Sequence, residues 1–151
     1  MKSRMIMVLC LALSSIAPGF SQHAPTGFYM VIADKNNCPN LVHTLTGETM
    51  YCLPKDPIIT ESEFEAVGDI IIDKPHKEKR FDLRLSAAGF KTLATLADKL
   101  PDSRVALVIS GHVSGIYESK GQVLKRTVVV RGDISSPDIE WMHDKVVKKQ
   151  P

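Results

Sequence analysis

Cysteines are the residues best suited to covalent chemistry in this chain. Cys10 lies in an apolar N-terminal run, whereas Cys38 and Cys52 lie in the mixed sequence that follows it. Cys10 belongs to a predicted signal peptide, described below, so Cys38 and Cys52 are the cysteines that remain after its removal. An even number of cysteines in an exported chain favours a disulfide. Closing the loop between Cys38 and Cys52 contributes about 3 kcal/mol through the entropy of the unfolded chain. The sequence contains no Cys-x-x-Cys motif, so it predicts a structural bridge rather than a redox pair. The alternative is two free thiols.

The histidines form no recognisable metal-binding pattern. No two of them lie four residues apart on an expected helix, and none belongs to a spaced cluster with cysteines or carboxylates. His112 lies in Ser110-Gly-His-Val-Ser114, which raises the question of a Ser–His pair. Adjacent residues on a turn rarely point at each other, so the commoner alternative is a loop histidine that faces water. We expect no metal ligands and no catalytic residues among His23, His43, His76, His112 and His143.

Three acidic residues, Glu61, Glu63 and Glu65, alternate in a way that suggests paired carboxylates. Glu63 follows Thr60 at the spacing of a helix-capping box, and the other two are expected on a solvated face. Gly111 and Gly115 lack the Lys-Ser/Thr that a phosphate-binding loop needs. We therefore predict no cofactor.

Basic residues flank a β-branched run near the C-terminal end of the chain. Lys125, Arg126 and Arg131 are positioned either to hold an acidic peptide or, as is commoner, to protect a sheet edge from aggregation. Trp141 lies beside the apolar face of an expected helix and is interpreted as core or rim rather than as a stacking platform.

The N-terminal residues have the organisation of a secretory signal peptide. Lys2 and Arg4 form a positive segment, and the apolar run 5–17 is too short to span a bilayer. We predict a signal peptide over 1–22, cleavage near Gln22 and His23, and export to the periplasm or medium of a bacterium. A lipid anchor at Cys10 is not expected, because Leu9 stands where a lipobox needs a small residue.

Composition excludes some classes of partner. Charged residues make up 24% of the chain and hydrophobic residues 44%, which is ordinary for a globular protein. Lys2 and Arg4 account for two of 19 basic residues, so 17 basic and 17 acidic residues follow the predicted cleavage. A neutral mature chain gives no electrostatic reason to bind nucleic acid. We expect no membrane span after the signal and one domain over 23–149.

The segment 80–132 defines the expected fold. Apolar and charged residues alternate in 81–85, as in a half-buried strand. Ser86 stands at an N-cap position, and an apolar helical face runs from Phe90 to Leu100. The continuous apolar run 105–109 predicts a strand covered on both faces. A turn region over 111–115 and a β-branched strand over 127–130 complete a packed α+β unit.

The remaining elements are expected around that unit, with sheets that are antiparallel or mixed. Strands are predicted over 28–33, 41–45, 49–53 and 69–73, a loop over 34–40, a charged turn over 74–79, a short helix from Thr60 to about Val67 with Gly68 after it, and a final helix that begins near Ser135–Asp138.

The order of these motifs resembles the head of the first periplasmic domain of SecD, the export-assisting subunit of the bacterial Sec translocon. The similarity covers roughly residues 50–145 and includes Leu85-Ser-x-x-Gly-Phe90, the run 105–109 and the β-branched run 127–130. Two stretches, 110–116 and 124–127, differ from the SecD pattern. The resemblance implies a SecD-head-like fold and contact with emerging polypeptide.

Three hypotheses for function follow. The first is an exported, non-catalytic interaction domain that binds extended or unfolded polypeptide or an envelope protein. The second is a small secreted enzyme whose site is assembled only in space. The third is a structural accessory of an envelope complex. An unpaired sheet edge favours the first hypothesis and a deep polar pocket favours the second, but the sequence names no ligand-binding residues.

Overall fold

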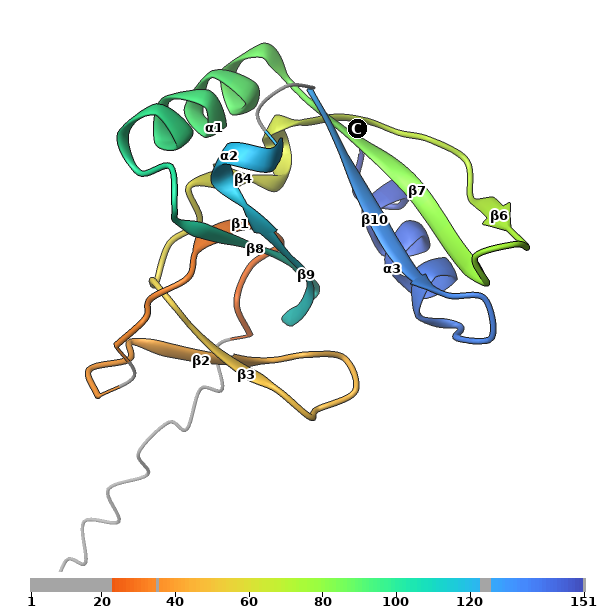
Figure 1. Cartoon of the computed structure of the whole chain (residues 1–151), viewed down its shortest axis with the longest axis horizontal. Coiled ribbons are helices and arrows are strands. Elements are labelled where there is room, and N and C mark those ends of the chain that lie inside the picture. Colours follow the sequence, from red (N-terminus) through yellow and green to blue (C-terminus); the bar gives the residue numbers. More distant parts are fainter. Residues whose placement is uncertain (1–22, 35, 123–125, 151) are drawn as a thin grey trace, which may run out of the picture.

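The structure, a computed structural model, describes residues 23–34, 36–122 and 126–150. It is an α+β fold in which the helices lie beside antiparallel sheets (Figure 1). The strands are β1 (Gly27–Met30), β2 (Asn40–His43), β3 (Met50–Leu53), β4 (Ile59–Thr60), β5 (Phe64–Val67), β6 (Ile71–Asp73), β7 (Glu78–Leu85), β8 (Arg104–Ile109), β9 (His112–Glu118) and β10 (Thr127–Asp133). The helices are α1 (Ala87–Lys99), α2 (Ser119–Gln122) and α3 (Asp138–Val147).

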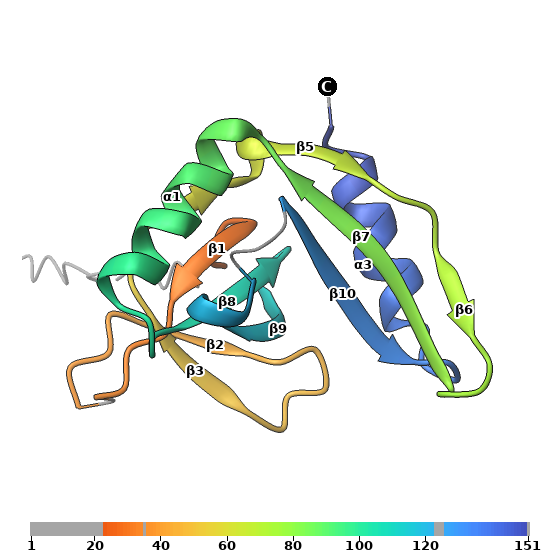
Figure 2. The same ribbon diagram turned by 45° about the horizontal axis from the view of Figure 1, so that its top comes forward.

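Two sheets form the main layer. One has the strand order β4-β1-β8-β9, and the other has the order β10-β7-β5 with β6 also paired to β7. Figure 2 shows that β10 lies on the side of its sheet that faces β9. The free edges of β9 and β10 therefore face each other.

Helix α1 confirms the expected cap and helix after β7, although Leu100, which was expected on its apolar face, follows the helix and is exposed. The Ser86 side chain accepts a hydrogen bond from the Gly89 amide at 3.1 Å, and this satisfies one of the unpaired amides of the first turn. Gly89, Leu93 and Ala97 form the buried face of the helix. Leu93 packs into the main core, so α1 covers the sheets at this end of the molecule.

The main core lies between the two sheets and the helices. Its residues come from β1, β7, β8 and β10 and from both long helices, and α3 contributes Ile139, Met142 and Val146. Those three side chains recur at i, i+3 and i+7, which places them on one helical face. The final helix thus packs on the predicted face and begins within the predicted range, but Pro137 rather than a serine is its N-cap.

A second, smaller core lies on the other face of β8. The hairpin β2–β3 covers Ala106 and Val108, while Val105, Leu107 and Ile109 face the main core. Because alternate residues of a strand point to opposite faces, every residue of the apolar run is buried. The expectation of a strand covered on both faces is confirmed.

The short helix predicted from Thr60 to Val67 is wrong in its second half. The Thr60 amide donates to Glu63 Oε2 at 2.8 Å, as a capping box requires, but the helix is a single 3₁₀ turn at Glu61–Glu63. The chain then continues as β5, because Phe64 is buried in the main core and pairs with Leu85 of β7. Pairing and burial of this segment override its local helical signal.

The turn expected over 111–115 is shorter than predicted. Ser110 and Gly111 have φ angles of 48° and 84°. Two successive positive φ angles are typical of the type I′ turn, which connects two hairpin strands through two residues. His112 already belongs to β9, and Gly115 lies within that strand. The turn predicted over 74–79 is also shorter, because β7 begins at Glu78.

Candidate functional site: the groove between β9 and β10

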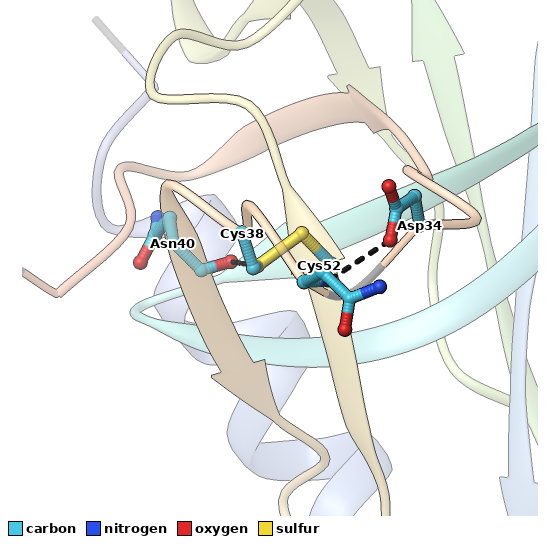
Figure 3. The surroundings of a disulfide bond; sticks show 5 residues. Asp34, Cys38, Asn40 and Cys52 are labelled. Carbon is cyan, nitrogen blue, oxygen red and sulfur yellow. Dashed lines mark hydrogen bonds between the residues drawn. A yellow bond between two sulfur atoms is a disulfide. The ribbon is translucent and has the colours of Figure 1, made fainter.

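The two cysteines that follow the predicted signal lie together beside the hairpin. Cys38 precedes β2 and Cys52 lies on β3, and they form a disulfide with a Cα–Cα distance of 5.5 Å (Figure 3). Cys38 Sγ also lies 3.3 Å from the Asn40 carbonyl oxygen, a packing contact because a disulfide sulfur carries no proton to donate. The bridge thus fastens the loop before β2 to the second strand of the hairpin.

The structure brings together three histidines that the sequence shows as scattered. His23, His43 and His112 line one hollow of about 150 Å³ beside the 110–111 turn. Among the described residues, no three histidine, cysteine or acidic side chains are arranged to hold a metal ion. Sequence spacing gave no signal for this grouping, because it depends on the contact of the hairpin with β9.

His112 does not face water as a loop residue, so that expectation is wrong. Its side chain is half-buried, and its ring lies edge-on to Trp141 with 5.9 Å between ring centroids. Trp141 packs against the main core. The neighbouring Ser114 hydroxyl donates to the Leu107 carbonyl at 3.0 Å, so it is committed to the sheet and not directed at His112.

Glu61 and Glu65 form ion pairs rather than a carboxylate pair, and Glu65 is exposed, as expected for a solvated face. Glu65 contacts Arg84 at 2.9 Å and Arg126 at 2.8 Å. Glu61 lies 3.4 Å from Lys149. These contacts tie β5 to β7 and the start of the 3₁₀ turn to the end of α3.

The basic residues near β10 have separate roles. Arg126 donates to the Leu85 carbonyl and to Glu65, so it anchors the start of β10. Arg131 lies 3.4 Å from Glu78, and its side chain is 55% exposed. Lys125 lies outside the described residues. Arg131 is thus the basic side chain of this set that faces solvent along β10.

The four edges of the two larger sheets differ in how far they are covered. Strand β4 has two residues and contacts α1, and the edge made by β5 and β6 is interrupted at residues 68–70. Strands β9 and β10 have seven residues each. The long free edges therefore face each other across the gap between the sheets (Figure 2).

A groove follows these two edges. One hollow of about 350 Å³ is lined by residues 114–117 of β9 and by Val129 and Arg131 of β10. A second hollow of about 360 Å³ continues past Ser114 and Arg131 to residues 44–46, 132–133 and the start of α3. We call these two hollows the edge groove. Its two hollows share Ser114 and Arg131 as lining residues, so they adjoin each other.

Main-chain groups of β10 point into this groove. The Leu85 amide bonds to the Arg126 carbonyl at 2.8 Å, and the Ile134 amide bonds to the Lys77 carbonyl at 2.8 Å. Even-numbered residues of β10 therefore direct their main-chain N–H and C=O groups toward β7. Alternation along an antiparallel strand directs the N–H and C=O groups of Val129 and Arg131 the opposite way, toward β9.

Strand β9 is less regular than β10. Its pairing with β8 shifts at Ser114, and Val113 forms a parallel bridge with Thr44 of the hairpin. By the same alternation, Ile116 directs its main-chain groups toward the groove. The β9 wall thus offers fewer regularly spaced groups than the β10 wall.

Tyr117 closes one end of the groove. Its ring lies across Gly115, where a Cβ atom would be 2.7 Å from the tyrosine oxygen, so glycine is needed there. The hydroxyl donates to the Val129 carbonyl at 3.3 Å. Burial raises the pKa of Tyr117, which keeps the hydroxyl protonated as a donor.

The electrostatics of the groove change along its length. Arg131 borders both hollows, whereas Asp133 and Asp138 border the hollow next to α3. Hydrogen bonds from the Ser135 side chain and backbone lower the pKa of Asp133. The described lining residues offer one cation, main-chain groups of β10 directed away from β7, and an acidic end, an arrangement that suits binding of an extended chain.

The cysteine pair, the helix face and the buried strand were found from the sequence, but the edge groove was not. Whether a strand edge is paired depends on segments far apart in the chain. The departure from the SecD pattern at 110–116 was the nearest signal, since most of that stretch forms the β9 wall.

The predicted cleavage site near Gln22 lies at the border of the described residues, and the signal segment lies outside them. Among the described residues, no helix has both the length and the apolar character needed to cross a bilayer.

Comparison with known proteins gives a match in structure. No protein-family model matches the chain, and no curated protein matches it in sequence. A solved structure of SecDF, described as a membrane component that enhances protein export, superposes with a TM-score of 0.57 over 85% of this chain and 70% of that chain, at 14% identity. Identity this low speaks to fold alone, so the assignment to the head subdomain stays a prediction. In its fold, this chain is similar to SecDF.

Proposed function

We propose that this chain is an exported interaction domain that binds extended or unfolded polypeptide in connection with protein export and performs no chemistry. Two features support the proposal. The fold is similar to that of SecDF, a component described as enhancing protein export. The longest free sheet edges border an open groove rather than a deep polar pocket, which is the feature that favours binding over catalysis.

The edge groove is the observation that carries the proposal. A polypeptide in export is unfolded, so its main-chain N–H and C=O groups are available to a partner. An unpaired strand edge binds such groups by strand addition, and it does so with little dependence on side-chain sequence. Sequence tolerance of this kind suits a domain that meets many different clients.

The disulfide supports a location outside the cytoplasm. Disulfides persist in oxidising compartments such as the bacterial periplasm, and Cys38 and Cys52 are joined. Together with the predicted signal peptide over 1–22, the bridge supports the proposal that the domain acts in the periplasm or medium. We infer that the domain acts as a passive holder of client chain or through an envelope protein partner.

Binding of a client in two conformational states tests this proposal. The ¹⁵N-labelled chain is titrated with α-lactalbumin, once native and once reduced and carboxymethylated so that it stays unfolded. We expect amide shifts only with the unfolded form, with a dissociation constant in the micromolar to millimolar range. The native form is the matched control, because it has the same sequence with its main chain already paired.

Two results would contradict the proposal. One is the absence of shifts with unfolded α-lactalbumin at millimolar concentration. The other is turnover of a substrate in a hydrolase screen that a point substitution in this chain abolishes, which would favour the enzyme hypothesis.

A further inference from the structure

We propose that the client's extended segment adds as a strand to β10, with main-chain hydrogen bonds to Val129 and Arg131 and with an acidic side chain near the Arg131 guanidinium. This inference rests on the proposed polypeptide binding and names where and how that binding occurs.

The regularity of β10 is the first step of the argument. Its seven residues pair with β7 without a register shift, from Thr127 with Arg84 to Asp133 with Glu78. The amides of Val129 and Arg131 and the Arg131 carbonyl therefore follow an even two-residue repeat, which an incoming strand can match. The facing strand β9 has an irregularity at Ser114 and a bridge to Thr44, so it matches a strand less well.

The limits of the binding segment follow from the ends of β10. The Tyr117 hydroxyl already bonds to the Val129 carbonyl, and the Asp133 carbonyl accepts from the Ser136 amide at 3.0 Å. Between these two carbonyls lie the amide and carbonyl of Arg131 and the amide of Asp133, and the Val129 amide lies just before them. The span from Val129 to Asp133 covers roughly 13 Å, which corresponds to a client segment of four or five residues.

The Arg131 side chain supports the charge preference. It borders both hollows of the groove, and its contact with Glu78 is long, at 3.4 Å, between exposed side chains. An exposed ion pair of this kind is weak, so a client carboxylate can compete for the guanidinium. Other occupants of this edge, such as a second copy of this chain, are distinguished by the test below.

Hydrogen exchange locates the binding segment directly in the unmodified chain. In the free protein, the amides of Val128 and Val130 face β7 and should exchange slowly, whereas those of Val129 and Arg131 should exchange faster. The probe is the peptide acetyl-Thr-Val-Glu-Val-Thr-amide. At saturation we expect it to slow exchange at Val129 and Arg131 at least tenfold and to leave Val128 and Val130 unchanged.

Modified probes separate main-chain from side-chain recognition. A version N-methylated at both valines and a version N-methylated at the other three residues each lose the donors of one strand edge. At least one version should bind ten times more weakly or worse. Replacing Glu with Gln in the peptide should weaken binding about two- to fivefold, and this difference should disappear in Arg131→Gln.

The outcomes distinguish this inference from the proposed function. Protection that appears at β5 and β6 or on a helix, with β10 unchanged, would overturn the β10 assignment and leave polypeptide binding intact. Affinity of both N-methylated peptides equal to that of the unmodified peptide would do the same. A concentration-dependent dimer seen by analytical ultracentrifugation, with Val129 and Arg131 protected before peptide is added, would assign this edge to a second copy. Absence of binding by both the peptide and unfolded α-lactalbumin would overturn both proposals.

Discussion

Strands β8 and β10 are both built from an apolar, β-branched run, yet they occupy opposite situations. Strand β8 pairs with β1 on one side and β9 on the other, and both of its faces are covered. Strand β10 pairs only with β7 among the described strands, and only Val128 and Val130 enter the core. The apolar run thus sets which residues are buried, while pairing depends on the rest of the chain.

The difference in pairing between β8 and β10 assigns stability mainly to β8 and binding mainly to β10. A strand covered on both faces and both edges has no group left for a partner, so it holds the fold together. A strand with one free edge contributes less to stability and retains main-chain groups for association. We therefore expect substitutions in β8 to affect folding and substitutions on the open side of β10 to affect binding.

Truncation of Leu107 should have the largest effect on stability. Its side chain is fully buried in the main core at the middle of β8. Leu107→Ala should lower the free energy of unfolding by about 2–5 kcal/mol, because it removes buried apolar surface and leaves a cavity. Urea unfolding followed by circular dichroism measures this.

Val129→Ala is the matched control on β10. Val129 is only half-buried, so this truncation should cost less than about 1 kcal/mol. Equal losses for Leu107→Ala and Val129→Ala would contradict the distinction between the two strands.

Removal of the disulfide should have the next largest effect, because it loosens the layer that covers the second face of β8. Replacing Cys38 and Cys52 together by serine should lower the free energy of unfolding by about 2–4 kcal/mol through the entropy of the unfolded chain. Reduction of the wild type should reproduce the loss, and the double variant should be insensitive to reductant. Rapid alkylation of both thiols in native, unreduced protein would refute the bridge.

The elements that could be predicted from the sequence are those with local causes. Ser86 caps α1 because its hydroxyl reaches the amide of Gly89 three residues later, and the buried run of β8 has no polar residue to expose. The pairing of Cys38 with Cys52 was inferred from their number and the expected compartment, so it too needed no knowledge of the fold.

The elements that the sequence did not predict have distant causes. Phe64 begins a strand because Leu85 of β7 pairs with it and Phe28 of β1 packs edge-on against its ring at 5.8 Å. His23 and His112 come together through the contact of residues 23–24 with the 110–111 turn. The edge groove exists because β10 pairs with β7 alone among the described strands and β9 has, beyond β8, a single bridge to Thr44, which no local pattern in either strand reveals.

High pH should weaken the sheet that contains β8. Burial, with a smaller contribution from Asp56, raises the pKa of Tyr29 to about 12, above the value of about 10 for an unfolded tyrosine. The contribution of this group is therefore complete below about pH 10 and is lost as the pH rises toward 12.

Tyr29→Phe tests this assignment. The substitution removes the hydrogen bond to the Pro25 carbonyl at 2.8 Å, so it should cost about 1 kcal/mol at neutral pH. Stability should then fall less steeply between pH 10 and 12. Tyr117 also has a raised pKa, so part of the slope should remain. An unchanged slope would contradict the role of Tyr29.

Low pH should weaken the sheet that contains β7 and β10. Of the four predicted effects on stability, we expect this one to be the smallest. Asp73, Asp133 and Glu140 all have lowered pKa values, and they lie at the ends of β6 and β10 and on α3. For Glu140 the main cause is the hydrogen bond from Lys79 at 2.6 Å. Because the folded-state pKa is the lower one, its contribution is present above the ordinary value of about 4.3 and is lost as the pH falls through the folded-state value.

Lys79→Met should therefore make the fall in stability below about pH 4 less steep. Asp73 keeps its hydrogen bond from His76 and Asp133 keeps those from Ser135, so most of the acid sensitivity should persist. Lys148→Met is the matched control, because Lys148 contacts Asp144 at only 4.0 Å from a largely exposed position. Thermal unfolding between pH 2.5 and 6 measures both variants. If the two behave alike, the Lys79–Glu140 contact does not link α3 to β7 in solution, and the acid response of this sheet belongs to the turns alone.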